Sequence, residues 1–388
     1  RVFVYAPKEW RLEYAKTNPL VKAKDAKGIK EEVERDFPHL PLICQIQLEE
    51  KAKAYVLENI KGYINGFRKN RIISTIQHFS KDYSEPLSLS SFLRLTHVPI
   101  EKLYNGTTWN ELLYLAGVGK SVSGMNVELS RAVNKKWLST DSHSYFSFIH
   151  RLSSCQFRIR ESMLTDKEKK MALMLYYDLY DAAGVYDSLQ DMFDSLSGDK
   201  IFVDEVCEVT AYLMDHCNAL EKDDNSSLNN VMPLKLHGVY TKSQIQVAIG
   251  TSTITKKSSN REGCERNVLN GVALEAMFVD IIKDREIGSN TNYNDFAQSS
   301  CKFHWETQNK VSPESLTGQK YIRQTQTMLL FVRKQAKAAD NPTRTMGYVY
   351  LGEVKLESYS GSRPMQIVWL LKDPMPGEVY EYAVKYVV

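Results

Sequence analysis

Two stretches of the sequence decide the fold: FHWETQN at residues 303–309 and LLFVR at residues 329–333. In a β-strand, successive side chains point to opposite faces. The first stretch therefore sets a polar face against a largely aromatic one, with His304, Glu306 and Gln308 opposite Phe303, Trp305 and Thr307. The second places Leu329, Phe331 and Arg333 on one face, so that an apolar strand ends in a guanidinium. An arginine there is placed either to pair with Glu306 or to meet a phosphate.

The sequence around these stretches predicts a β-rich C-terminal module over residues 231–388. Runs of β-branched and aromatic residues, separated by Gly, Pro, Asn and Ser, occur at 274–283, 302–308, 327–333, 347–356 and 365–371. Such a series of short strands is typical of a small barrel- or sandwich-like domain. Ahead of them, Thr241 and Gln244 have the spacing of a capping box, which predicts a short helix.

Residues 47–230 predict an α-helical scaffold, because apolar residues recur there at intervals of three and four. Between 86 and 117 the pattern indicates several short helices in a helix-turn-helix-like module, with serines at N-cap positions and Gly117 as a helix stop. A polar run at 221–230 marks the boundary between scaffold and β-rich module. The lysine-rich residues 1–46 are interpreted as a linker or the tail of a preceding domain. The predicted fold class is α+β.

Composition narrows the functional classes. The chain has 388 residues, 43% of them hydrophobic, and no apolar run long enough for a membrane span. Its six cysteines show no CxxC spacing, so we expect reduced thiols and a cytoplasmic location. The net charge is +3, and residues 234–388 hold 20 Lys and Arg against 15 Asp and Glu. That balance fits a nucleic-acid partner and an ordinary solvated surface equally well. The chain begins at Arg1 in a strand-like run, which suggests a piece of a longer polypeptide.

Two local patterns suggest catalysis only weakly. AGVGKS at residues 116–121 resembles half of a phosphate-binding loop, but Tyr114 stands where the first glycine is needed and the segment follows a predicted helix. Glu353 and Lys355 on a predicted strand, with Asp340 upstream, have the pattern of a metal-dependent nuclease. The same two residues also suit an exposed strand face. Possible metal ligands around Cys301 and His304, or around Cys207, lack a fourth member, and buried structural cysteines explain them better.

The chain from about residue 47 to 388 resembles the C-terminal domain of unknown function that follows the motor of bacterial DEAD/DEAH-box superfamily II helicases, many of which carry an N-terminal phospholipase-D-like nuclease domain. The motifs that carry the resemblance lie in one order along the chain: QL at 47–48, FL at 92–93, Trp109, LHGVYT at 236–241, NYNDFA at 292–297, FHWETQN at 303–309, LFVR at 330–333, YLG at 350–352 and SGSRPM at 360–365.

The resemblance implies DNA processing or defence against foreign or modified DNA, such as phage DNA. The parent protein would be an ATP-dependent helicase, and the partners would be DNA and the helicase and nuclease domains of the same polypeptide. This segment lacks the phosphate-binding loop and Asp-Glu box of the motor, so we expect no ATP hydrolysis, no cofactor, no metal site and no catalytic residues in it.

Our leading hypothesis is a non-catalytic accessory segment that binds nucleic acid. Imidazole, carboxylate and amide groups read base edges, arginine grips phosphate or guanine, and aromatic rings stack on bases. The candidate recognition residues are Tyr293, Asp295, His304, Trp305, Glu306, Gln308, Arg333 and Arg363. The same residues also suit a buried hydrogen-bond network between strands. A nuclease using Glu353 and Lys355, and a structural adaptor between helicase and nuclease domains, are the alternatives.

Overall fold

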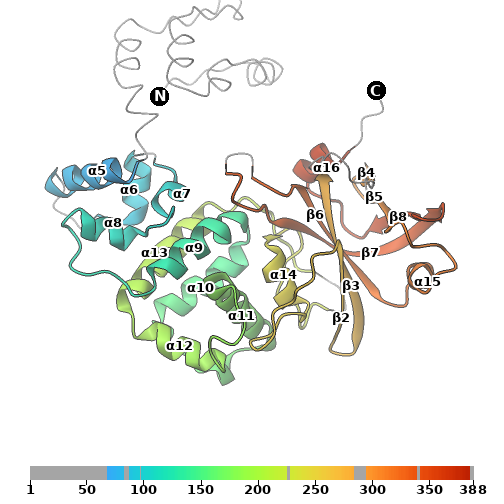
Figure 1. Ribbon diagram of the computed structural model, residues 1–388, viewed down its shortest axis with the longest axis horizontal. Helices are drawn as coiled ribbons and strands as arrows, with labels where there is room; N and C mark the ends of the chain where they lie inside the picture. The colour runs from blue at the N-terminus through green and yellow to red at the C-terminus, as the bar shows by residue number, and fades with distance from the viewer. Residues whose placement is uncertain are drawn as a thin grey trace, which may run out of the picture. The chain divides into compact units, whose positions relative to one another are not determined.

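The computed structural model describes residues 68–82, 87–96, 98–224, 228–283, 294–338 and 341–384 (Figure 1). Contacts divide the chain into two units. The first comprises Arg1–Leu87 with Leu115–Val118, and its described helix is α5 (Lys69–Asp82). The second comprises Ser88–Tyr114 with Gly119–Val388, so the sheet and the remaining described helices belong to it, except for Leu115 at the end of α8 (Trp109–Leu115). Most of the helix that the sequence predicts from Gln47 lies outside the described residues.

The N-terminal half of the second unit is helical, as predicted. Its helices are α6 (Leu89–Thr96), α7 (Ile100–Leu103), α8 (Trp109–Leu115), α9 (Asn126–Lys135), α10 (His143–Ser154), α11 (Asp166–Tyr180), α12 (Leu189–Ser197) and α13 (Lys200–Asp215), with 3-10 turns η2 (Trp137–Ser139) and η3 (Glu161–Met163). The short helices predicted between 86 and 117 are confirmed as α6 to α8. Ser88 accepts a hydrogen bond from the Ser91 amide at 3.2 Å, and Gly117 has a φ of +75° just after α8.

Local sequence explains where these helices begin. Asp199 caps α13 by accepting from the Phe202 amide at 3.0 Å. Thr165 and Glu168 form a complete capping box at the start of α11. The capping box predicted from Thr241 and Gln244 is also present and starts α14 (Lys242–Ala248). Each cap satisfies amide groups that a first helical turn leaves without partners.

The C-terminal half of the unit contains one mixed sheet of eight strands. The strands are β1 (Val239–Tyr240), β2 (Cys264–Leu269), β3 (Val272–Ile282), β4 (Phe296–Ser299), β5 (Lys302–Glu306), β6 (Thr327–Gln335), β7 (Tyr348–Ser360) and β8 (Gln366–Leu371). Their order is β2-β3-β6-β7-β8-β5-β4, with β1 paired to β7. The α+β fold is confirmed and the five predicted strands are all present, but the sheet is not closed into a barrel.

The two faces of the sheet follow the predicted alternation. Phe303 and Trp305 of β5 belong to an apolar core with Leu330 and Val332 of β6. Helices α15 (Leu316–Arg323) and α16 (Gly377–Ala383) contribute Tyr321, Val379 and Ala383 to the same core. On the opposite face Phe331 stacks on Phe278 and Tyr350, with ring centroids 5.7 and 4.8 Å away. Because both faces of β6 are covered, this strand is buried from Met328 to Arg333.

The sheet is strongly curled. Strands β3 and β5 are separated in the sheet order by β6, β7 and β8, yet residues just after β3 and just before β4 meet. Lys283 Nζ lies 2.9 Å from the carboxylate of Asp295. On its other side β3 pairs with β2 only as far as Met277, opposite Cys264, so Phe278–Ile282 extend beyond the start of β2. The opening between this part of β3 and the end of β5 holds a cavity.

Candidate nucleic-acid site in the opening of the sheet

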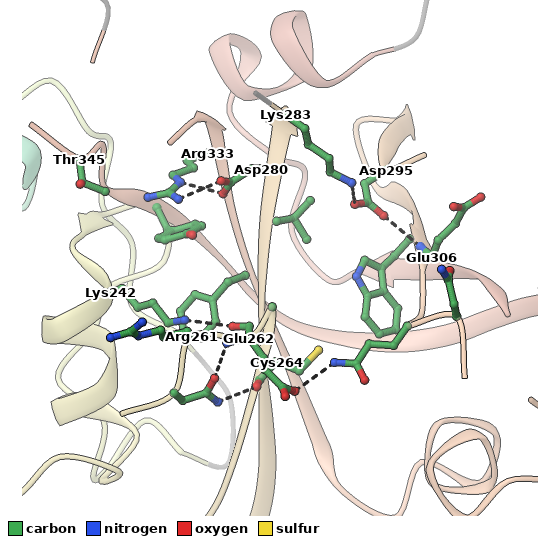
Figure 2. Close-up of a pocket in the computed structure, with 18 of the residues that line it drawn as sticks. Lys242, Arg261, Glu262, Cys264, Asp280, Lys283, Asp295, Glu306, Arg333 and Thr345 are labelled. Carbon is green, nitrogen blue, oxygen red and sulfur yellow. Dashed lines mark hydrogen bonds and ion pairs between the residues drawn. The ribbon is translucent and has the colours of Figure 1, made fainter. Parts of the chain in front are cut away.

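The cavity has a volume of about 950 Å³ and is lined by residues from β3, β5, β6 and β7, from α14, and from the loops before β2 and after β5. Figure 2 shows Arg333 and Asp280 on one side of it and Lys283, Asp295 and Glu306 on the other. Four of its side chains are acidic (Glu262, Asp280, Asp295, Glu306) and five are basic (Lys242, Arg261, Lys283, Lys310, Arg333). A cavity with charges of both signs suits a polar ligand better than a purely apolar one.

Arg333 is held by a network rather than left free. Its guanidinium makes two bonds to Asp280, from Nε at 2.7 Å and from the second terminal nitrogen at 2.9 Å. The first terminal nitrogen donates to the Met346 carbonyl at 3.0 Å, and the group lies 4.2 Å from the centre of the Tyr348 ring. Asp280 and Arg333 are register partners in the parallel pair β3 and β6. The partner of Arg333 is therefore Asp280, and not Glu306 as the sequence suggested.

The opposite wall is organised by Asp295. One carboxylate oxygen pairs with Lys283 at 2.9 Å, and the other accepts from the Glu306 amide at 3.0 Å. Burial is the largest influence on this carboxyl and raises its pKa, and the nearby Lys283 partly opposes that rise. Glu306 in turn accepts from the Asn294 amide through one of its oxygens, at 3.0 Å. This reciprocal arrangement fixes the end of β5 beyond the last residue paired with β4.

A hydrogen bond joins the two loops that line the cavity, the loop before β2 and the loop after β5. Gln308 Nε2 donates to Glu262 at 3.0 Å. Both residues also line a neighbouring cavity of about 330 Å³, which shares Trp305 and Lys310 with the first. On the α14 side, Lys242 Nζ donates to the Glu262 carbonyl at 3.0 Å and lies 4.7 Å from the Phe278 ring centre. Burial lowers the pKa of Lys242.

Five of the eight residues predicted from sequence line the main cavity: Asp295, Trp305, Glu306, Gln308 and Arg333. His304 lies elsewhere, since its ring stacks on Phe296 at 4.7 Å and its Nδ1 donates to the Asn294 carbonyl at 2.8 Å. Arg363 is exposed in the turn between β7 and β8 and does not line the cavity. Tyr293 lies outside the described residues.

Sequence reasoning missed the cations at the rim. Arg261 precedes β2, a strand that was not predicted, and Lys310 follows Asn309 just after the polar stretch. Both side chains are exposed, and neither has an ion-pair or hydrogen-bond partner among the described residues. Lys310 could have been found only from its position, two residues beyond Gln308. Asp280 lies inside the strand predicted at 274–283 and Lys283 at its end, but the sequence did not indicate which residues they would pair with.

The residues of the nuclease hypothesis lie apart from the cavity. Both residues lie on β7. Glu353 is half-buried and pairs with Leu329 of β6, and Lys355 is exposed and pairs with Leu370 of β8. Asp340 lies outside the described residues. Over the described ranges, no three His, Cys, Asp or Glu side chains are grouped as metal ligands. No helix in those ranges is both long and apolar enough to cross a membrane.

Comparison with known proteins gives one match to a family model, over the β-rich part of the chain. A comparison with curated proteins finds no match to this sequence. A family model matches the segment that begins five residues before β1 and ends at the last residue of α16, so this segment contains the sheet and the cavity. Residues 234–383 match the protein family described as Domain of unknown function (DUF3427).

Proposed function

We propose that this chain is a non-catalytic accessory segment that binds nucleic acid through the cavity at the opening of the sheet. In the setting that the sequence resemblance implies, it would bind DNA on behalf of the helicase and nuclease domains of a longer bacterial polypeptide. The observation that carries the proposal is the composition of the cavity lining, which combines the exposed cations Arg261 and Lys310 with Trp305, Glu306 and Gln308.

Each of these lining groups has a role in nucleic-acid recognition. Arginine and lysine without protein partners neutralise backbone phosphates and release counterions, which supplies most of the affinity for any sequence. Carboxylate and amide side chains accept from and donate to base edges, and an indole provides a surface for a base. Arg333 and Asp280 support the site instead of reading it, because their hydrogen-bonding groups are already used within the protein.

Fluorescence anisotropy with labelled single-stranded and duplex oligonucleotides tests the proposal. The double variant Arg261→Glu/Lys310→Glu is expected to weaken binding at least tenfold near 0.1 M salt. For a single strand, losing two phosphate contacts would reduce the slope of log K against log salt by about 1.4. A matched control is Arg158→Glu/Arg160→Glu, which reverses two exposed arginines of the helical region and makes the same change in net charge.

Equal effects of the two double variants would refute the cavity as the binding site. No binding by the unaltered chain at low salt would refute the proposal itself and favour a structural adaptor. Incubating the same oligonucleotides with magnesium separates the nuclease alternative: cutting that is lost in Glu353→Ala would establish it, and intact DNA is what the proposal expects.

A further inference from the structure

The geometry points to a single extruded nucleotide, carrying a base with an exocyclic amino group, as the unit that enters the cavity. This inference rests on the proposed function and specifies its ligand. It follows from the shape of the opening, from which lining groups still lack partners, and from where the unpaired cations lie.

The shape excludes a duplex from the interior. The cavity occupies the opening between β3 and β5 within a single curled sheet, and its volume of about 950 Å³ lies in the range of small-molecule sites. A base pair within a stacked helix cannot enter such an opening, whereas one nucleotide rotated out of the stack can. Proteins that bind a base in this way recover the cost of unstacking from contacts inside the pocket.

The partners of the lining carboxylates select the kind of base. Both oxygens of Asp280 and both oxygens of Asp295 are occupied by protein donors. Glu306 and Glu262 each use one side-chain oxygen, towards the Asn294 amide and Gln308 respectively. Within the described residues, the second oxygen of each has no hydrogen-bond donor. Glu262 is exposed and keeps its hydration, whereas Glu306 is half-buried. The second oxygen of Glu306 is therefore the acceptor for the amino group of cytosine or adenine, which thymine lacks.

The cations and the aromatic residue complete the arrangement. Arg261 and Lys310 are exposed cavity-lining residues, and therefore suit the phosphates that flank an inserted nucleotide. Trp305 is 7% exposed and lines both the main and the neighbouring cavity. The faces of Phe278 and Tyr348 are already covered by Lys242 and Arg333. Trp305 packs against Tyr321 and Trp369 of the core, with ring centroids 5.6 and 6.2 Å away, but no cation lies over it among the described residues. Trp305 is therefore the lining ring that we expect an inserted base to contact.

Gly263 offers a way to block the cavity without disturbing the sheet. It is exposed, it lines the cavity, and a Cβ added there would meet its nearest atom, the Phe278 carbonyl oxygen, at an ordinary 3.5 Å. Gly263→Ala is therefore tolerated and leaves the cavity open, while Gly263→Trp adds a large ring to its wall. The backbone bond from the Phe278 amide to the Gly263 carbonyl, 2.7 Å long, is available in both variants.

The experiment uses a duplex with one 2-aminopurine, whose fluorescence rises when it leaves the stack. Binding of the unaltered chain is expected to raise that fluorescence several-fold, and Gly263→Trp is expected to abolish the rise and lower affinity at least tenfold relative to Gly263→Ala. In oligothymidine strands, one cytosine or adenine is expected to tighten binding several-fold. Glu306→Gln should remove this preference, because it keeps an acceptor for Asn294 and replaces the unpartnered oxygen with an amide.

DNA binding without a fluorescence change, or equal affinities of the two Gly263 variants, would overturn this inference and leave the proposed function intact. A preference for cytosine or adenine that persists in Glu306→Gln would overturn the assigned base reading. Absence of DNA binding by the unaltered chain would overturn both proposals, and an extended peptide along the uncovered part of β3 would then be the occupant to pursue.

Discussion

Replacement of Arg333 by methionine tests whether this arginine stabilises the sheet. Its guanidinium makes two bonds to Asp280 and one to the Met346 carbonyl, and its side chain is only 10% exposed. Removing one partner of a buried ion pair costs about 3–5 kcal/mol, because the other charge is left without compensation. The Asp280 side chain is 26% exposed and regains some hydration. We therefore expect Arg333→Met to lower the free energy of unfolding by about 3 kcal/mol.

Urea denaturation followed by circular dichroism measures this loss, with Lys334→Met as the matched control. Lys334 is the exposed neighbour on the same strand, and its replacement should change the unfolding free energy by less than about 0.5 kcal/mol. Adding Asp280→Asn to Arg333→Met should cost less than the sum of the single changes, with a coupling energy of about 2 kcal/mol. A loss below about 1 kcal/mol for Arg333→Met, or additive single variants, would refute the account of this pair.

Three further predictions concern the framework around the site. Burial raises the pKa of Asp178 to about 6 from 3.8, so its contribution to stability is greatest below pH 4 and is lost as the pH rises to 6, by about 3 kcal/mol. The unfolding free energy of the unaltered chain, measured relative to that of Asp178→Asn, should fall over that range, and parallel pH profiles of the two would contradict this. Glu205 accepts from the amides of Trp109 and Asn110 at the start of α8, at 2.7 and 2.9 Å, so Glu205→Gln should lower the urea-unfolding free energy by about 2 kcal/mol, and an unchanged midpoint would argue against that role. A Cβ on Gly318 would lie 2.0 Å from the Ser312 carbonyl oxygen, so Gly318→Ala should cost about 1–3 kcal/mol, whereas Gly263→Ala should leave the melting temperature unchanged.

The sequence allowed prediction of strands whose residues carry a strong local signal. Strands β3 and β6 are continuous apolar runs, and β5 alternates aromatic and polar side chains, so composition and period suffice. Strand β2, with the sequence CERNVL, is a half-polar edge strand, and β4 has only four residues. Neither has enough β-branched or aromatic content to be distinguished from a loop.

The site was partly predictable because its residues cluster around one polar stretch. Asp295, Trp305, Glu306 and Gln308 lie within 14 positions of one another in the sequence, and all four line the cavity. The partner of Arg333 was not predictable, because Asp280 lies 53 positions away and meets it only through the parallel register of β3 and β6. The cavity itself results from the curl of the whole sheet, which no local pattern encodes.

The position of a bound base can be measured directly by photocrosslinking. A single-stranded oligonucleotide with one 5-iodocytosine in an oligothymidine background is irradiated with the unaltered chain, and the modified peptides are identified by mass spectrometry. We expect crosslinks to Trp305, which Gly263→Trp should suppress and Gly263→Ala should retain. Crosslinks confined to residues outside the cavity, such as the exposed Tyr359 near the end of β7, would contradict the claim that nucleic acid is read in the opening of the sheet.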